Sequence, residues 1–322
     1  MESCQKLKKI ILTQPRIMDP NRVDDYRRLL YLEMQKRFGF DLLVKDEVCE
    51  KDICGYDLVF VDPRKYLHKN IYEKTIGLLS TKAKIVVYLL DPELPVFGNR
   101  EYDSELYLTG REFFCDRADL IVGDVYQYFR DFYSNEWDKW KGKYIWWPKC
   151  IAKIERYRML PFNKNPEPYC YLSGKIKNLF PLRKVAAGIS KSKIATNRHP
   201  GYENNLSADY TGDNFGKILN RYLCCFCGSR IFGNVLEKHL IIPASGSLML
   251  ADSFPDLNKM GLLANTHYLE VESDSLETTI DKVISSPKKY EEIRMAGRNY
   301  VLQNHTIEHR METLGKAMNE YF

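Results

Sequence analysis

The sequence has no long hydrophobic run. No stretch approaches the roughly 20 apolar residues that a membrane-spanning helix needs. Residues 1–16 (MESCQKLKKIILTQPR) contain no apolar segment long enough for a signal peptide. We therefore expect a protein without a membrane span that is located in the cytoplasm.

Positive charge is not concentrated in a basic stripe. The chain has 48 Lys and Arg residues against 43 Asp and Glu residues, so its formal net charge is +5, spread along its length. Proteins that bind nucleic acids usually carry a clustered basic face, and we expect no nucleic-acid partner. The small positive excess fits a site for an anionic diphosphate, although an ordinary solvated surface gives the same balance.

The nine cysteines match neither a disulfide framework nor a zinc site. Their number is odd and their spacing is irregular. The CCFC motif at 224–227 lies in an apolar run, and no second Cys/His pair at zinc spacing accompanies it. We expect the cysteines to be small buried hydrophobic residues in a reducing compartment.

Apolar segments alternate with helical segments in both halves of the chain. Continuous apolar runs are typical of parallel strands in a sheet that helices cover on both faces. The predicted strands are 8–14, 41–44, 56–62, 83–91, 118–124 and 143–148, and then 168–174, 192–197, 222–228, 247–252 and 267–271. The predicted helices are 21–38, 70–80, 101–117, 180–190, 215–221, 234–246, 275–285, 287–303 and 305–322.

This pattern predicts an α/β fold with two Rossmann-like domains, whose parallel sheets face a central cleft. At roughly 100–200 residues per domain, two domains are expected for this length. The charged, proline-bearing segment 150–165 separates them. We expect domains at 1–155 and 156–304, with the final helix, 305–322, at or across their junction.

A glycine turn in the second half is the first candidate phosphate site. In LSGKIKNLFPLR (172–183) a strand ends at Ser173-Gly174, and Lys175 and Arg183 follow. Backbone N–H groups of such a turn can bind phosphate oxygens while cations neutralise their charge. Cations after a strand are, however, more often plain solvated surface.

A helix start and a long loop are two further candidates. In FGNVLEKHLIIPASG (232–246), Asn234 is a predicted N-cap, Glu237 its capping-box partner and Gly246 the C-terminal glycine. The helix N-terminus would attract a diphosphate, although an ordinary capped helix packed on the sheet has the same pattern. The polar loop 198–214 carries His199 and exceeds the usual connection length.

Three segments of the second half resemble a known family. KHLIIPASG (238–246) precedes an apolar strand that ends in Asp, SGKIKNLFPLR (173–183) combines a Gly turn with a Pro-x-Arg helix start, and 286–314 holds an AGR segment followed by HT. These segments resemble the C-terminal domain of group 1 glycosyltransferases, especially the branch with spore-maturation-type proteins. The resemblance implies a GT-B fold, with the sugar-nucleotide donor in 156–304 and the acceptor in 1–155.

The resemblance and the motifs together give a set of donor-binding candidates. They are Gly174, Lys175, Arg183, His199, Asn234, Glu237, Lys238, Ser245 and Gly246. One departure is notable, because the family glutamate that binds the donor ribose falls at Ile241, which cannot accept hydrogen bonds. Glu237, one turn earlier on the same helix face, is a possible substitute. Otherwise the backbone holds the ribose, the donor differs or activity is lost.

The catalytic candidates are two carboxylates at predicted strand ends in the first half. Asp91 and Asp62 each follow an apolar strand and precede a proline. A carboxylate there can orient or deprotonate an acceptor hydroxyl. Aspartate is equally an ordinary choice for an Asp-Pro turn.

The leading hypothesis is a metal-independent hexosyl- or pentosyltransferase. It would move a sugar from a nucleotide diphosphate sugar to a hydroxyl of a glycan or small acceptor, with no cofactor. No Asp-x-Asp metal motif is present. The alternatives are a sugar-nucleotide epimerase of the same fold, a non-catalytic nucleotide- or carbohydrate-binding derivative, and a glycosyltransferase acting on nucleic acid.

Overall fold

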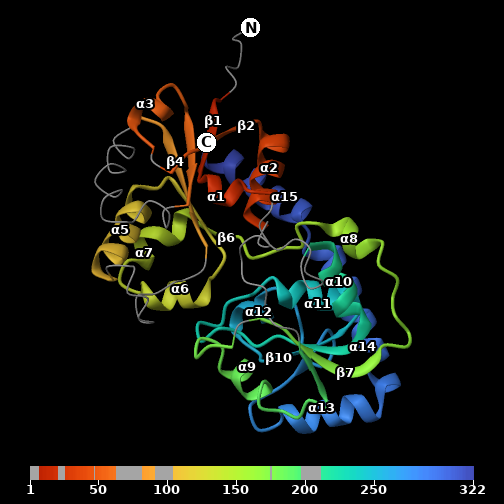
Figure 1. The fold of residues 1–322 in the computed structure, drawn as a ribbon. Helices are drawn as coiled ribbons and strands as arrows, with labels where there is room; N and C mark the ends of the chain where they lie inside the picture. The colour runs from red at the N-terminus through yellow and green to blue at the C-terminus, as the bar shows by residue number, and fades with distance from the viewer. Residues whose placement is uncertain are drawn as a thin grey trace. The chain divides into compact units, whose positions relative to one another are not determined.

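The computed structural model describes residues 7–20, 26–46, 48–62, 82–90, 104–174, 176–196 and 212–322. The chain forms two compact units, each with its own parallel sheet flanked by helices (Figure 1). The first unit consists mainly of residues up to Pro148 together with Met311–Phe322, and the second consists mainly of Lys149–Arg310. The prediction of two α/β units with parallel sheets is confirmed.

The sheet of the first unit has six strands in the order β2-β1-β3-β4-β5-β6, and every adjacent pair is parallel. Its strands are β1 (Lys9–Thr13), β2 (Phe40–Val44), β3 (Leu58–Val61), β4 (Lys84–Leu89), β5 (Leu120–Gly123) and β6 (Tyr144–Trp146). Each coincides with a predicted apolar run. β3 and β5 are buried along their whole length, as expected for central parallel strands.

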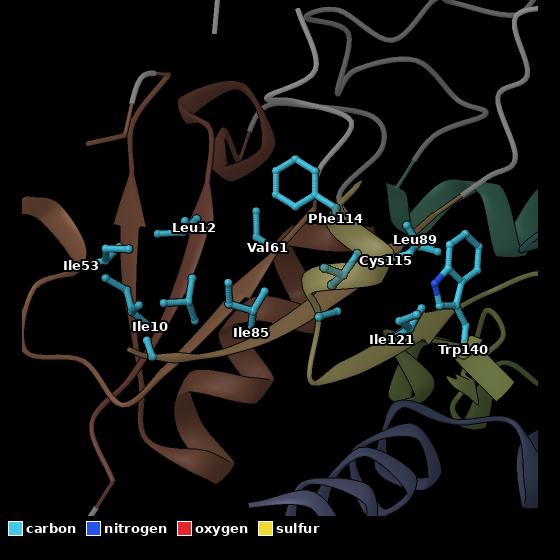
Figure 2. Close-up of a cluster of buried hydrophobic side chains, with 14 of the residues drawn as sticks. Ile10, Leu12, Ile53, Val61, Ile85, Leu89, Phe114, Cys115, Ile121 and Trp140 are labelled. Atoms are coloured by element: carbon cyan, nitrogen blue, oxygen red, sulfur yellow. The ribbon is translucent and has the colours of Figure 1, made fainter. Parts of the chain in front are cut away.

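One face of this sheet packs against α5 (Ser104–Arg117) and α7 (Trp137–Trp140) (Figure 2). The strand side chains that meet there come from alternate positions, since successive residues of a strand point to opposite faces. They include Ile10, Leu12, Val61, Ile85, Leu89 and Ile121, and they pack against Phe114 and Cys115 of α5 and Trp140 of α7. This hydrophobic core holds the strand ends of the first unit in place.

Two of the helices in the first unit, Tyr26–Phe38 and Ser104–Arg117, fall within the predicted helices 21–38 and 101–117. The helices of this unit are α1 (Pro15–Met18), α2 (Tyr26–Phe38), α3 (Glu50–Ile53), α5 (Ser104–Arg117), α6 (Gln127–Phe132), α7 (Trp137–Trp140) and the 3-10 helix η4 (Lys141–Lys143). α2 buries Tyr26, Leu30 and Met34 at helical spacing and is followed by Gly39, whose φ of 69° lies in the left-handed region. The predicted helix 70–80 lies outside the described residues.

The sheet of the second unit has five parallel strands in the order β11-β10-β9-β7-β8. They are β7 (Glu167–Leu172), β8 (Ile194–Thr196), β9 (Tyr222–Phe226), β10 (Leu248–Ala251) and β11 (Leu269–Glu270). The chain runs from β7 outward to β8 and then returns to β9 on the other side of β7. The strand order therefore reverses between β7 and β9.

Helices of the second unit lie between these strands and after them. They are α8 (Ile154–Arg158), α9 (Pro181–Ala186), α10 (Gly212–Arg221), α11 (Lys238–Ser245), α12 (Pro255–Lys259), α13 (Leu276–Ser285), the 3-10 helix η5 (Pro287–Tyr290) and α14 (Glu291–Asn304). The last helix, α15 (Ile307–Tyr321), continues into the first unit. None of the helices in the described ranges has both the length and the hydropathy needed to span a membrane.

The cysteines of the second sheet are buried, as predicted. Cys170, Cys224, Cys225 and Cys227 are fully buried free thiols. The expectation of burial is wrong for Cys49 and Cys54, which are exposed. Both flank the short helix α3 at the surface, outside any strand.

α11 begins later than the sequence pattern predicts. The N-cap position belongs to Glu237, and no side chain caps the helix. The predicted capping box, with Asn234 as N-cap and Glu237 three residues later, is therefore wrong. The backbone N–H of Leu236 donates instead to Nδ1 of His239 at 2.9 Å, and Gly233 has a φ of 60°. These features keep the segment before Lys238 out of the helix.

Candidate anion-binding site

The candidate site lies at the reversal of strand order in the second sheet. In open α/β sheets, ligands bind beyond the carboxyl ends of the strands at such a switch point. β7 ends at Leu172 and is followed by Ser173 and Gly174. β9 ends at Phe226, and the segment after it leads to the N-terminus of α11. These two segments border the same point of the sheet.

Three predicted donor-binding residues meet there. A Cβ atom at position 174 would lie 2.9 Å from Nζ of Lys238 and 3.0 Å from Nη1 of Arg183. Gly174 also has a φ of 101°, which side-chain-bearing residues rarely adopt. Glycine is thus favoured both by the backbone and by the close approach of two cations. We call Ser173, Gly174, Arg183 and Lys238 the cationic cluster.

Lys238 enters the cluster from the first turn of α11. Its Nζ donates hydrogen bonds to the backbone oxygen of Ser173 at 2.8 Å and to Oγ of Ser173 at 2.6 Å. Burial, and after it the neighbouring charge of Arg183, lower the pKa of Lys238 to about 7. The ammonium therefore sits where its charge is costly in the absence of an anion.

Arg183 enters from α9. Only 4% of the residue is exposed, so the alternative that it is a solvated surface cation is wrong. Its guanidinium carbon lies 3.8 Å from the centroid of the Phe180 ring, and that of Arg230 lies 5.8 Å from the same ring. Stacking on an aromatic face fixes the guanidinium plane. A guanidinium held in one orientation can donate paired hydrogen bonds to the oxygen atoms of a phosphate.

Asn234 lies in the segment before α11 and is fully buried. Within the part of the chain that the structure describes, neither its amide nitrogen nor its amide oxygen has a hydrogen-bond partner. An unsatisfied buried amide costs about 1–3 kcal/mol. A hydrogen-bond partner is therefore expected for the Asn234 amide, although Asn234 is not the helix N-cap that the sequence pattern predicts.

His239 was not among the predicted residues, yet it shapes the start of α11. It is fully buried, and its ring packs edge-on against Phe254 at 5.3 Å between centroids. Burial lowers its pKa to about 4. Because Nδ1 accepts the N–H of Leu236, the neutral ring carries its proton on Nε2. Histidine here orders the backbone beside Lys238, and no spacing rule reveals this role.

Ser245 and Gly246 are not brought to the cationic cluster. They lie at the opposite end of α11, about 10 Å away for an eight-residue helix. Oγ of Ser245 donates to the backbone oxygen of Ile242 at 2.6 Å. Gly246 ends the helix with a φ of 86° and accepts a hydrogen bond from Nε of Arg294 at 2.9 Å. Their contacts are structural.

Ile241, the position of the family glutamate, is 5% exposed. It lies in the middle of α11 among residues that are all buried. Glu237, the suggested substitute, is partly exposed at the N-cap. Three other candidates, Lys175, His199 and Asp91, lie outside the described residues.

The first unit has a similar edge of polar side chains. Its strand order reverses between β1 and β3, where Thr13 ends β1 and Asp62 follows β3. Both are 2% exposed, and Asp62 accepts a hydrogen bond from Nη1 of Arg27 at 3.2 Å. Asp124, after β5, is equally buried and was not among the predicted site residues. No group of His, Cys, Asp and Glu within the described ranges is arranged to hold a metal ion.

Comparison with known proteins gives a consistent picture. A family model described as glycosyl transferase-like matches residues 181–316. A search of curated protein sequences finds no match. Among solved structures, HepE from Anabaena in complex with UDP-glucose has a TM-score of 0.61 at 10% identity, covering 97% of this chain and 99% of HepE.

Two further structures share the fold. A glycosyltransferase from Rickettsia africae has a TM-score of 0.57 at 12% identity, covering 98% of both chains. Sucrose-phosphate synthase from Thermosynechococcus elongatus has a TM-score of 0.55 at 11% identity, covering 92% of this chain and 78% of the synthase. The chain therefore has the fold of the GT-B glycosyltransferases, and its second half matches a glycosyl transferase-like family.

Proposed function

We propose that this protein is a glycosyltransferase that moves a sugar from a nucleotide diphosphate sugar to an acceptor hydroxyl. The cationic cluster at the switch point of the second sheet is the observation that carries the proposal. Lys238 and Arg183 both approach Gly174 there. The glycosyl transferase-like match over 181–316 and the GT-B fold support the same activity. The spore-maturation-type branch of group 1 is the subfamily we propose.

In this proposal the second unit binds the donor through its diphosphate. Arg183 and Lys238, which both lie close to the turn at Gly174, neutralise phosphate oxygens. As the bond to the sugar breaks, negative charge grows on the departing diphosphate, and fixed cations stabilise that change. Asn234 and Glu237, with Lys175 and His199, complete the proposed donor site.

The acceptor binds in the first unit, where Asp62 and Asp91 are the proposed catalytic carboxylates. Asp62 is held in place by an ion pair with Arg27. An ionised carboxylate can orient the acceptor hydroxyl and receive its proton. We propose a hydroxyl of a glycan as the acceptor and a hexose or pentose as the transferred sugar.

We also propose that transfer needs no metal ion. Protein cations at the cluster take the place of a metal in neutralising the diphosphate. Activity is then expected to persist in the presence of EDTA. Loss of activity in EDTA, restored by magnesium or manganese, would contradict this part of the proposal.

Product analysis tests the function directly. The protein is incubated with UDP-, GDP- and dTDP-sugars, with and without oligosaccharide acceptors, and products are identified by mass spectrometry and NMR. A glycosylated acceptor, or release of free sugar and nucleoside diphosphate, supports the proposal. An epimerised sugar favours the epimerase alternative. Nucleotide binding without any turnover favours a non-catalytic derivative.

A further inference from the structure

The surroundings of Lys238 include groups that favour its ammonium form and groups that oppose it. Among the described residues, the groups beside it are Ser173 after β7, Arg183 of α9, Phe215 of α10, Cys225 of β9, Cys227 just after β9, and the adjacent Glu237. Burial and Arg183 oppose the charged form, whereas the Glu237 carboxylate favours it. Burial raises the pKa of both thiols well above neutrality, so neither carries negative charge at pH 7.

The geometry at Nζ fits a neutral amine as well as an ammonium ion. A neutral amine has two N–H donors and one lone pair. Nζ makes two hydrogen bonds, both to Ser173, and these use both donors. Protonation of the lone pair creates a third donor, and glycine at position 174 keeps a side-chain carbon from pressing on Nζ. An anion arriving there gains both a donor and a positive charge.

We infer that Lys238 takes up a proton from solvent when a nucleoside diphosphate binds at the cationic cluster, and returns it when the diphosphate leaves. This inference rests on the proposed function, because it takes the diphosphate as the ligand. The step adds one proton to the Nζ lone pair and forms no covalent bond to the ligand. Arg183 cannot exchange a proton in this way, since a guanidinium stays charged at all accessible pH values.

Proton uptake has a measurable consequence for affinity. With a pKa of about 7 in the free protein, only about a tenth of Lys238 is charged at pH 8, so binding takes up close to one proton. Each pH unit above 7 then weakens binding up to about tenfold. The diphosphate is already fully ionised in this range and contributes little to the pH dependence.

Calorimetry in two buffers measures proton uptake separately from ligand binding. UDP, GDP and dTDP are titrated into the protein at pH 8.0 in HEPES and in Tris, whose ionisation enthalpies differ widely. For the nucleotide that binds, the apparent enthalpy is expected to change with the buffer by a slope near one proton taken up. Equal enthalpies in both buffers overturn the inference but leave the proposed function intact. Absence of binding by all three overturns both.

Two variants test whether Lys238 is the residue that takes up the proton. Lys238→Arg keeps a cation that does not titrate, so its buffer slope is expected to fall to near zero. Lys184→Arg, at an exposed neighbouring lysine of α9, is the control and keeps the slope. A Lys238→Arg protein that retains the slope overturns the inference. If this variant does not fold, the wild-type affinity between pH 7.5 and 9.0 decides, since a pH-independent affinity contradicts proton uptake.

Discussion

Gly174 is the residue where backbone and side-chain constraints meet. Its φ of 101° is unfavourable for an alanine, and a Cβ there would press on Lys238 and Arg183. Gly174→Ala is expected to cost about 1–3 kcal/mol of unfolding free energy and to weaken nucleotide binding. Denaturant unfolding and nucleotide titration measure the two effects.

Gly142→Ala is the matched control, because a Cβ at position 142 meets no atom within 4 Å. It is expected to change stability by less than about 0.5 kcal/mol. Unchanged nucleotide binding and stability in Gly174→Ala would show that Lys238 and Arg183 need not keep their present positions.

Ile241 tests what the departure from the family pattern means. Its burial predicts that Ile241→Glu places an unpaired carboxylate in the interior and lowers stability by about 2–4 kcal/mol. Ile241→Val, which removes one methylene, is expected to cost only about 0.5–1.5 kcal/mol. Melting curves with and without nucleotide report both effects. Tighter nucleotide binding at an unchanged melting temperature in Ile241→Glu would instead place position 241 at the ligand.

At the scale of elements, α14 secures the segment that enters the second unit. Arg294 of α14 is 3% exposed and donates to the backbone oxygens of Gly246 at 2.9 Å and Asn163 at 2.7 Å. Its guanidinium also lies over the Phe162 ring at 4.7 Å. One side chain thus joins the end of α11 to the segment before β7.

Arg294→Met is therefore expected to destabilise the second unit by about 2–4 kcal/mol, because two buried carbonyl groups lose charged donors. Hydrogen exchange of the amides at 160–167 should accelerate at the same time. Arg158→Met removes an exposed arginine with a surface ion pair and is expected to change stability by no more than about 1 kcal/mol. Equal effects of the two substitutions would contradict the role given to Arg294.

At the scale of the whole molecule, hydrophobic patterning predicted both parallel sheets. Apolar runs such as 56–62 and 222–228 became buried central strands, because burial on both faces requires continuous apolar sequence. Short elements such as α12 were not predicted, since five residues give too little periodicity. The sequence pattern predicts that α11 begins at 234, earlier than the observed start at Lys238, because Asn and Glu at capping-box spacing also occur outside helices.

The candidate site was predictable only where backbone rules apply. Gly174 and Arg183 were found from a strand-end glycine and a following cation. The hydrogen bond from Lys238 to Ser173 could not be predicted, because it depends on tertiary packing between segments distant in sequence. The hydrogen bond from Leu236 to His239 could not be predicted either, because it forms in a loop where the sequence pattern predicts a helix turn.

Nucleotide-dependent melting of wild-type protein and of Arg183→Gln tests the central claim most directly. A ligand at 100 times its Kd adds about 2.7 kcal/mol of stability, so one of UDP, GDP, dTDP and CMP is expected to raise the wild-type melting temperature. Arg183→Gln, compared with its own ligand-free curve, should bind about 10- to 100-fold more weakly, whereas Lys184→Gln should bind like the wild type. No shift with any nucleotide, or an undiminished shift in Arg183→Gln, would contradict donor binding at the cationic cluster.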